Sequence, residues 1–145
     1  MAMRWQVTID CAEPAKLAHF WALALGYERE PPPPGFGSWQ EWCEHHGMPP
    51  EEVDEGASLI DPAGVGARLF FQRVPEPKVT KNRLHLDLLV GAGTDAPAEQ
   101  RWARVTETVD RLRAAGATVV HQDEWQDRPH HVVMADPEGN EFCVV

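Results

Sequence analysis

Four polar side chains in the second half of the chain combine residue types that metal sites and acid–base catalysts use. His85 and Asp87 alternate with leucines over residues 83–90, and Glu141 and Cys143 alternate with apolar residues near the C-terminal end. An imidazole and a carboxylate are common ligands of Zn, Ni, Fe and Mn, and a carboxylate can also move a proton. The spacing by itself favours plainer roles, namely a hydrogen-bonded core histidine for His85 and a solvated residue beside a turn for Glu141. No base is evident near Cys143, so we interpret that thiol as structural.

Two segments in the first half alternate in the same way. Each one places polar or aromatic side chains on the face that points away from the expected core. For the two glutamines of this face we favour hydrogen bonding in a pocket over metal ligation. The side chains concerned are Gln6, Thr8 and Asp10 in one segment, and Arg68, Phe70 and Gln72 in the other.

Residues 31–56 interrupt this alternation and form a lid-like insertion. The prolines at 31–34 cannot continue a regular element, and Ser38 with Glu41 predicts a capped short helix that carries Trp39 and Trp42. These tryptophans either grip an apolar or aromatic ligand or pack the insertion onto the domain. The candidate substrate-binding residues are Phe70, Trp39 and Trp42.

The histidine pairs at 45–46 and 130–131 also invite a metal-binding interpretation, which we do not favour. Adjacent residues on a strand point to opposite faces, so two neighbouring histidines there cannot easily share one ion. His121 shows no pattern.

Periodicity predicts one strand, one helix and three strands, and then the same order again. Gly26 and Gly116 end the two helices, and Asp-Pro-x-Gly turns begin at Asp61 and Asp136. This repetition predicts a duplicated α+β fold with its boundary near residues 75–77. The expected strands are 4–11, 27–30, 57–61, 68–74, 83–90, 117–121, 130–136 and 140–145, and the expected helices are 14–25 and about 96–115.

Composition narrows the functional classes. The 145 residues suit one globular domain, with 43% hydrophobic and 25% charged residues. A net charge of −10 argues against nucleic-acid binding and against binding to acidic membranes. No apolar run is long enough to span a membrane. The odd cysteine count, Cys11, Cys43 and Cys143, favours reduced thiols and a cytoplasmic location.

Several motifs together resemble one family. They are the opening segment 9–14, Phe20-Trp21, Leu25-Gly26-Tyr27, the stretch 74–87 and the ending 136–144. In these motifs the chain resembles the glyoxalase-like branch of the vicinal-oxygen-chelate (glyoxalase/bleomycin resistance/dioxygenase) superfamily, over nearly its whole length.

This resemblance implies a fold and a domain organisation. It implies two βαβββ modules that form one cupped mixed sheet, with the helices on the outer face. Residues 1–145 would then be a single domain. Module one would cover about 3–75, including the insertion 31–56, and module two would cover about 82–145.

The resemblance also implies a divalent metal, held by the first and fourth strands of each module. On this chain those positions are Gln6, Gln72, His85 and Glu141, and the metal would be Zn, Ni, Mn or Fe. Gln72 departs from the carboxylate expected at its place, so a site without metal is a second expectation. Glu141 is the candidate catalytic residue, as metal ligand, proton acceptor or both.

Three functional hypotheses follow. The first is a metal-dependent lyase or isomerase of the glyoxalase type that acts on a carbonyl compound. The second is a metal-free binding or sequestration protein of the bleomycin-resistance type, which commonly works as a homodimer. The third is an accessory domain for a partner enzyme. We predict a small-molecule-binding protein and leave its catalysis open.

Overall fold

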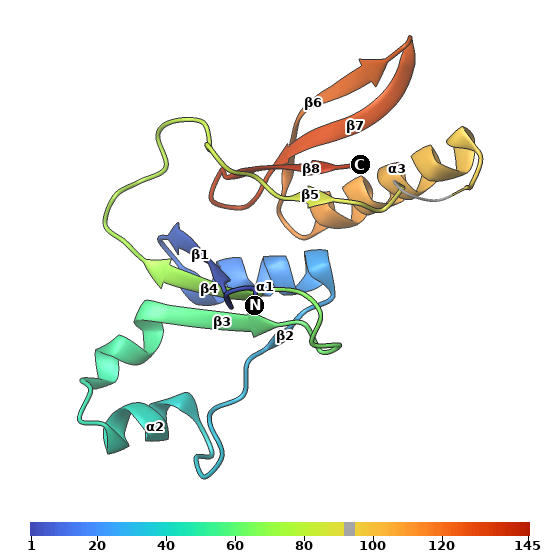
Figure 1. Cartoon of the computed structure of the whole chain (residues 1–145). Coiled ribbons are helices and arrows are strands. Elements are labelled where there is room, and N and C mark those ends of the chain that lie inside the picture. The colour runs from blue at the N-terminus through green and yellow to red at the C-terminus, as the bar shows by residue number, and fades with distance from the viewer. Residues whose placement is uncertain (92–94) are drawn as a thin grey trace. The chain divides into compact units, whose positions relative to one another are not determined.

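The computed structural model describes residues 1–91 and 95–145, and the chain divides into two compact units (Figure 1). Unit one is Met1–Pro77 and unit two is Lys78–Val145. The expectation that both join into one cupped domain stays a prediction.

Unit one has the order β1 (Gln6–Cys11), α1 (Pro14–Leu25), β2 (Glu28–Arg29), β3 (Gly56–Ile60) and β4 (Arg68–Arg73). Its four strands form one mixed sheet in the order β1-β4-β3-β2, in which only β1 and β4 are parallel. The insertion between β2 and β3 contains helix α2 (Trp39–His45) and the 3₁₀ helix η1 (Pro50–Glu55).

Unit two repeats this order. It contains β5 (Asp87–Leu88), α3 (Ala98–Ala114), β6 (Thr118–Trp125), β7 (Arg128–Ala135) and β8 (Glu141–Val144). The sheet order β5-β8-β7-β6, with β5 and β8 parallel, is the order of unit one. The predicted α+β fold of two βαβββ modules is therefore confirmed.

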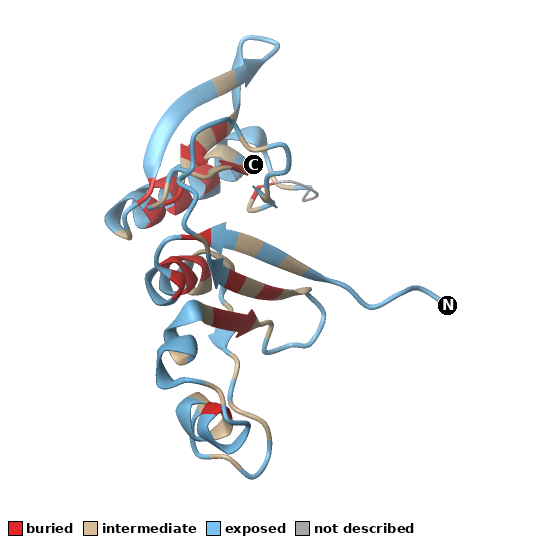
Figure 2. Ribbon diagram, turned by 90° about the vertical axis from the view of Figure 1, so that its left-hand side faces the viewer, coloured by how far each residue is buried: buried red, intermediate tan, exposed pale blue. Residues whose placement is uncertain are grey.

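The helix of each unit covers one face of that unit's sheet (Figure 2). Helix α1 begins with Pro14 in its first turn and ends at Gly26, whose φ of +71° suits glycine. It buries Leu17, Phe20 and Trp21. In unit two α3 buries Val105, Val109 and Leu112, and the sheet contributes Met134, Phe142 and Val144. These apolar faces are the cores of the two units.

The opposite face of each sheet carries the polar side chains. In β4, Leu69 and Phe71 are buried while Arg68 and Phe70 are half-buried, so the two sets alternate as predicted. The register places Gln6 opposite Arg68 and Thr8 opposite Phe70, on this same face. In unit two the register places Asp87 opposite Cys143.

Unit two departs from the expected boundaries at two places. The predicted strand 83–90 shortens to β5, and Leu84, expected in the core, is 88% exposed. The strands β6 and β7 extend towards each other and meet at Gln126 and Asp127, which have φ values of 51° and 57°. Two successive left-handed residues make the tight turn that best matches the twist of a hairpin.

No described helix is both long enough and apolar enough to cross a membrane.

Candidate functional site

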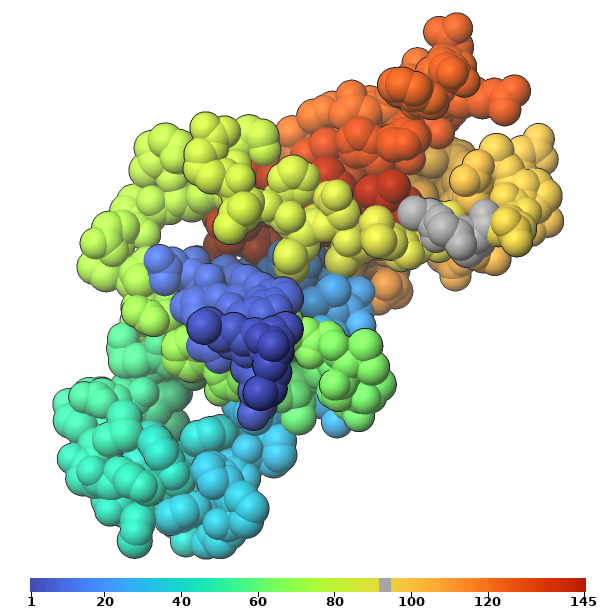
Figure 3. All heavy atoms as spheres, viewed as in Figure 1, coloured from blue at the N-terminus to red at the C-terminus, as the bar shows by residue number. Residues whose placement is uncertain are grey.

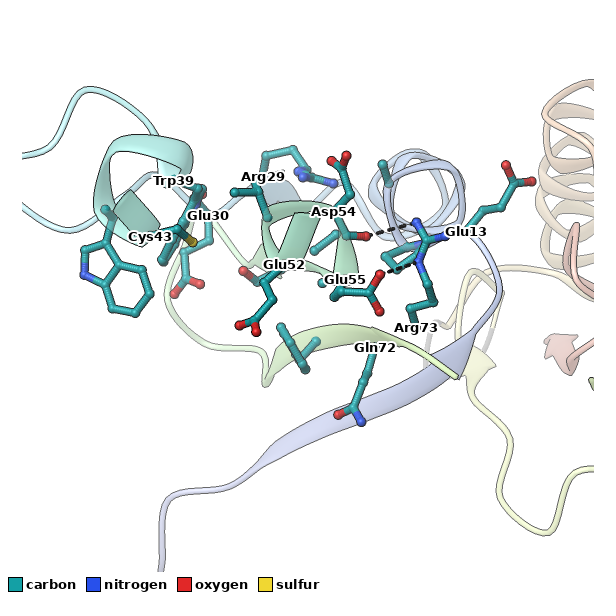
Figure 4. Close-up of a pocket in the computed structure, with 18 of the residues that line it drawn as sticks. Glu13, Arg29, Glu30, Trp39, Cys43, Glu52, Asp54, Glu55, Gln72 and Arg73 are labelled. Atoms are coloured by element: carbon teal, nitrogen blue, oxygen red, sulfur yellow. Dashed lines mark hydrogen bonds and ion pairs between the residues drawn. The ribbon is translucent and has the colours of Figure 1, made fainter. Parts of the chain in front are cut away.

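A cavity of about 830 Å³ lies on the polar face of the unit-one sheet, beneath the insertion (Figure 4). Its walls come from the start of α1, from β2, β3 and β4, and from α2 and η1 of the insertion. The space-filling view shows the insertion, in cyan and teal, as a lobe with a hollowed surface where it meets the rest of unit one (Figure 3). The volume is typical of a small-molecule pocket.

Aromatic side chains line one side of this cavity. Trp39 and Trp42 of α2 meet edge to face with ring centroids 5.6 Å apart, and Phe70 reaches the cavity from β4. Ser38 begins α2, because its hydroxyl accepts a hydrogen bond from the Glu41 amide at 3.0 Å. The Trp39 indole donates to the Glu30 carbonyl at 2.9 Å, which fixes the helix to the end of β2. The predicted substrate-binding residues therefore line one pocket.

Gly56 allows Phe70 to occupy its place. A Cβ atom at residue 56 would lie 2.8 Å from the Phe70 Cζ atom, closer than carbon atoms approach in folded proteins. The phenyl ring of Phe70 therefore lies directly over the glycine backbone. Sequence patterns did not identify this requirement, because it depends on the pairing of β3 with β4.

Arg68 makes polar contacts with Glu30, which follows β2, and with Gln6 of β1. Its Nε donates to both carboxylate oxygens of Glu30, at 3.0 and 2.9 Å, and its Nη1 donates to the Gln6 amide oxygen at 2.7 Å. Its guanidinium carbon lies 5.6 Å from the Phe70 ring centroid. The hydrogen bonds from Arg68 lower the pKa of Glu30. A bidentate pair of this kind fixes the position of both side chains.

Arg73 ties the insertion to β4. Its Nε lies 3.2 Å from a Glu55 carboxylate oxygen, and its Nη2 donates to the Asp54 carbonyl at 3.2 Å (Figure 4). Both partners belong to η1. The insertion is thus joined to the sheet at Trp39 and again at Arg73.

The two predicted glutamine ligands do not meet. Gln6 lies at the start of β1 opposite Arg68, and Gln72 lies near the end of β4 opposite Asp10. Four residues of a strand span roughly 13 Å. Gln72 lines the pocket, whereas Gln6 contacts Arg68.

In unit two the Glu141 carboxylate has a cation and a backbone donor as partners. Its Oε2 lies 3.1 Å from the Lys78 ammonium and accepts a hydrogen bond from the Asn82 amide at 3.0 Å. The hydrogen bond from Asn82, more than any other contact, lowers the pKa of Glu141 to about 2. At neutral pH Glu141 is therefore ionised and a weak proton acceptor.

His85, Asp87 and Cys143 form a separate cluster in unit two. The His85 Nε2 lies 3.3 Å from an Asp87 carboxylate oxygen, and one ligand atom from each of the three residues lies within 4.8 Å of the others. Burial and the neighbouring Asp87 raise the pKa of the Cys143 thiol to about 11. The side chains of His85 and Asp87 are exposed, whereas Cys143 is buried.

A further histidine cluster lies on the β6–β7 hairpin. The Asp123 Oδ2 lies 3.0 Å from the His121 Nε2 and 3.1 Å from the His131 Nε2, and the Nδ1 atoms of His130 and His131 lie 2.8 Å apart. We expected no pattern at His121. The signal was its spacing of two residues from Asp123, with His131 on the paired strand.

The positions expected to hold a metal fit a divalent cation poorly. The Gln6 oxygen already accepts a hydrogen bond from a guanidinium, and Glu141 pairs with an ammonium. In unit one Arg68 pairs with Gln6; in unit two His85 and Glu141 each lie two residues before the first pair of β5 and β8, Asp87 with Cys143, and the strand pairing does not extend to them. The metal roles of Gln6, Gln72, His85 and Glu141 stay predictions.

Comparison with known proteins gives consistent results. Residues 6–145 match the model of a family described as glyoxalase-like domain. No curated protein matches the chain.

Solved structures with similar folds cover nearly the whole chain. A possible glyoxalase from Bacillus cereus is 14% identical with a TM-score of 0.60, and 100% of this chain and 99% of that chain are covered. A glyoxalase/bleomycin resistance protein/dioxygenase family enzyme from Burkholderia phytofirmans is 16% identical with a TM-score of 0.58, over 96% and 94%. A mutant of the fosfomycin resistance protein FosX from Listeria monocytogenes, complexed with Mn(II) and 1S,2S-dihydroxypropylphosphonic acid, is 11% identical with a TM-score of 0.59, over 99% and 89%. At these identities the likeness shows the shared fold.

Proposed function

The chain belongs to the glyoxalase-like domain family of the vicinal-oxygen-chelate superfamily, and on that premise we propose that it binds a small molecule in the pocket of unit one. The observation that carries this proposal is the cavity of about 830 Å³ between β4 and the insertion. Trp39, Trp42 and Phe70 supply apolar contact area for a ligand. Rigid aromatic side chains of this kind dominate the energetics of many ligand sites.

The ligand class follows from the two sides of the pocket. The aromatic side suits a flat, largely apolar body. The remaining lining carries both signs of charge, including Arg29, Glu52 and Arg73. A ligand with an aromatic or conjugated body and polar or charged groups at its edge matches this lining.

Ligand binding in this pocket requires no metal ion. The Arg68 guanidinium supplies positive charge directly opposite Gln6, one of the positions expected to hold a metal, and it is held there by Glu30 and Gln6. This supports the binding or sequestration alternative, which bleomycin-resistance proteins exemplify. Adding a chelator should therefore leave the ligand affinity unchanged.

A dye titration tests the site. We expect 8-anilinonaphthalene-1-sulfonate, which has an aromatic body and one negative charge, to bind the whole chain with a rise in fluorescence. Trp39→Ala should weaken this binding roughly tenfold, the loss of about 1.4 kcal/mol of aromatic contact.

The matched control is Trp125→Ala, because Trp125 is an exposed tryptophan of β6 in unit two. Equal affinities for the two alanine variants, both shown to be folded by circular dichroism, would contradict the proposed pocket. If Trp39→Ala alone weakens dye binding, the apolar and aromatic compounds that displace the dye would identify the natural ligand class.

A metal-dependent lyase or isomerase is the second candidate. His85 and Glu141 favour it, because each precedes a member of the pair Asp87–Cys143 by two residues, so alternation assigns both to one face. Glu141 could act as a base only after release from Lys78 and Asn82, since its pKa of about 2 makes it a weak proton acceptor. Elemental analysis after purification without chelator tests this candidate. Near-stoichiometric metal that is lost in Glu141→Gln would support it.

A homodimer and a cytoplasmic location stay proposals. All three cysteines are buried thiols, which is compatible with a reducing compartment. Light scattering on the purified chain would determine the oligomeric state.

A further inference from the structure

We infer that His85, Asp87 and Cys143 of unit two form a binding site for a divalent transition-metal ion of the Zn²⁺ type. This site goes beyond the ligand pocket of unit one. It also differs from the expected metal positions, because Asp87 and Cys143 take the place of Glu141.

Strand pairing brings these three residues together. The parallel register of β5 and β8 sets Asp87 directly opposite Cys143, and His85 precedes Asp87 by two residues, on the same face. The His85 Nε2 lies 3.3 Å from an Asp87 oxygen, and all three ligand atoms lie within 4.8 Å of one another. Bond lengths of about 2.0–2.3 Å place tetrahedral zinc ligands roughly 3.5 Å apart. Side-chain rotations that close the cluster by about 1 Å would therefore complete the site.

The three donors also match the ion chemically. Imidazole nitrogen, carboxylate oxygen and thiolate sulfur are the donor types that Zn²⁺ prefers. On binding, the Cys143 S–H bond breaks, its proton passes to solvent and a sulfur–metal bond forms. The thiolate and the Asp87 carboxylate then balance the two positive charges of the ion. Three protein ligands leave a fourth position open to water or to another ligand.

The surroundings of the cluster allow a cation to enter. The side chains of His85 and Asp87 are 43% and 49% exposed, so the ion can approach from solvent. Two further charges lie near the Cys143 thiol: Lys81 lowers its pKa and Asp123 raises it. Asp123 contacts His121 and His131, and the register from β6 through β7 to β8 assigns it to the same sheet face as Cys143.

Glu141 is a poorer ligand here than its position suggests. Lys78 and the Asn82 amide occupy its carboxylate, and a metal ion would first have to displace both. The Asp87 carboxylate instead contacts the other two members of the cluster, because it lies 3.3 Å from the His85 Nε2 and forms a hydrogen bond with the Cys143 thiol.

Cobalt substitution tests the site directly. We would titrate the whole reduced chain with Co²⁺ and follow the near-ultraviolet absorption that a thiolate–cobalt bond produces. We expect saturation near one equivalent and reversal by added Zn²⁺. Cys143→Ser should abolish the thiolate absorption. Asp87→Asn should weaken Co²⁺ binding by roughly tenfold or more, because losing even a residue that only supports a metal ligand costs about that much. Asp87 is exposed, so this variant is expected to keep the fold.

Two control variants separate this site from the alternatives. Cys11→Ser removes a buried thiol of unit one and should leave the absorption unchanged. Glu141→Gln should also leave it unchanged. Wild-type chain without thiolate absorption, or absorption that survives Cys143→Ser, would overturn the inference. Loss of metal in Glu141→Gln but not in Cys143→Ser would transfer the metal to the expected set. The dye titration of unit one reports on the pocket independently of these results.

Discussion

Gly56 controls the ligand pocket without offering it a side chain. A methyl group at this position would lie 2.8 Å from the Phe70 ring, so the ring must move. Because Gly56 has an extended backbone with φ of −146°, the substitution adds no backbone strain. We expect Gly56→Ala to weaken dye binding while the chain stays folded. A dye affinity equal to that of the wild type would show that Phe70 does not shape the site.

The pairing of Glu141 with Lys78 and Asn82 should appear in the pH dependence of stability. The pKa of Glu141 is lowered from 4.5 to about 2, so its contribution is present in full above pH 4.5 and is lost as the pH falls towards 2. We expect Glu141→Gln to lower the free energy of unfolding at pH 7 by roughly 1 kcal/mol, a moderate value because the pair is partly exposed. Urea unfolding at pH 7 and pH 3 measures this difference. A loss of equal size at both pH values would exclude the ionic contribution.

At the scale of single elements, the two Asp-Pro-x-Gly turns provide a matched experiment. Asp136 is 3% exposed and its carboxylate accepts hydrogen bonds from the Glu138 and Asn140 amides at 2.9 and 3.0 Å. Asp61 accepts from the Ala63 and Gly66 amides in the same way, but in contact with solvent.

Removing the buried Asp136 carboxylate leaves its backbone amides without a hydrogen-bond partner. Water can replace the solvent-accessible Asp61 carboxylate as the acceptor for its amides. Asp136→Ala should therefore cost about 2–3 kcal/mol of stability, and Asp61→Ala should cost less. Thermal and urea unfolding of both variants check the order. The reverse order would mean that the turns have different structural roles.

Alternation along the chain predicted most elements, because the face of a strand residue depends only on its neighbours in sequence. The repeated βαβββ order followed from this. Alternation also assigned Phe70 and Gln72 to the face that lines the pocket. The predicted strand around His85 is longer than the observed one. Alternation in the sequence continues back to Leu84, whereas the pairing of β5 with β8 begins only at Asp87.

The contacts across strands could not be predicted. The offset between β1 and β4 decides that Arg68, rather than Gln72, lies opposite Gln6, and no local pattern fixes this offset. The contact of Phe70 with Gly56 and the cluster around Asp123 depend on register in the same way. The loops differ in length between the two units, so the register of one unit cannot be inferred from that of the other.

At the scale of the whole molecule, the acidic composition has a measurable consequence. The net charge of −10 at pH 7 falls to zero near the pI of 5.0. Because charge repulsion between molecules vanishes there, solubility should pass through a minimum near pH 5. Turbidity measured from pH 4 to pH 8 checks this. A minimum that occurs at pH 7 instead would indicate association through specific surfaces.

The two units share one strand order and carry different chemistry at equivalent positions. Unit one pairs an amide with a guanidinium across its parallel strands, Gln6 with Arg68, and unit two pairs a carboxylate with a thiol, Asp87 with Cys143. The proposed ligand pocket in unit one and the proposed metal site in unit two would therefore be two different sites built on one duplicated strand order.

The contacts of Arg68 also restrict how this chain can evolve. Arg68→Glu alone would introduce a carboxylate at a typical metal-ligand position, but it would leave Glu30 facing a second negative charge in place of its partner. Glu30→Ala alone would leave the guanidinium without its carboxylate. Each single step is unfavourable, and only the double change avoids both. A change from this arginine to a carboxylate at position 68 therefore requires two substitutions together, so it should occur rarely by single-residue steps.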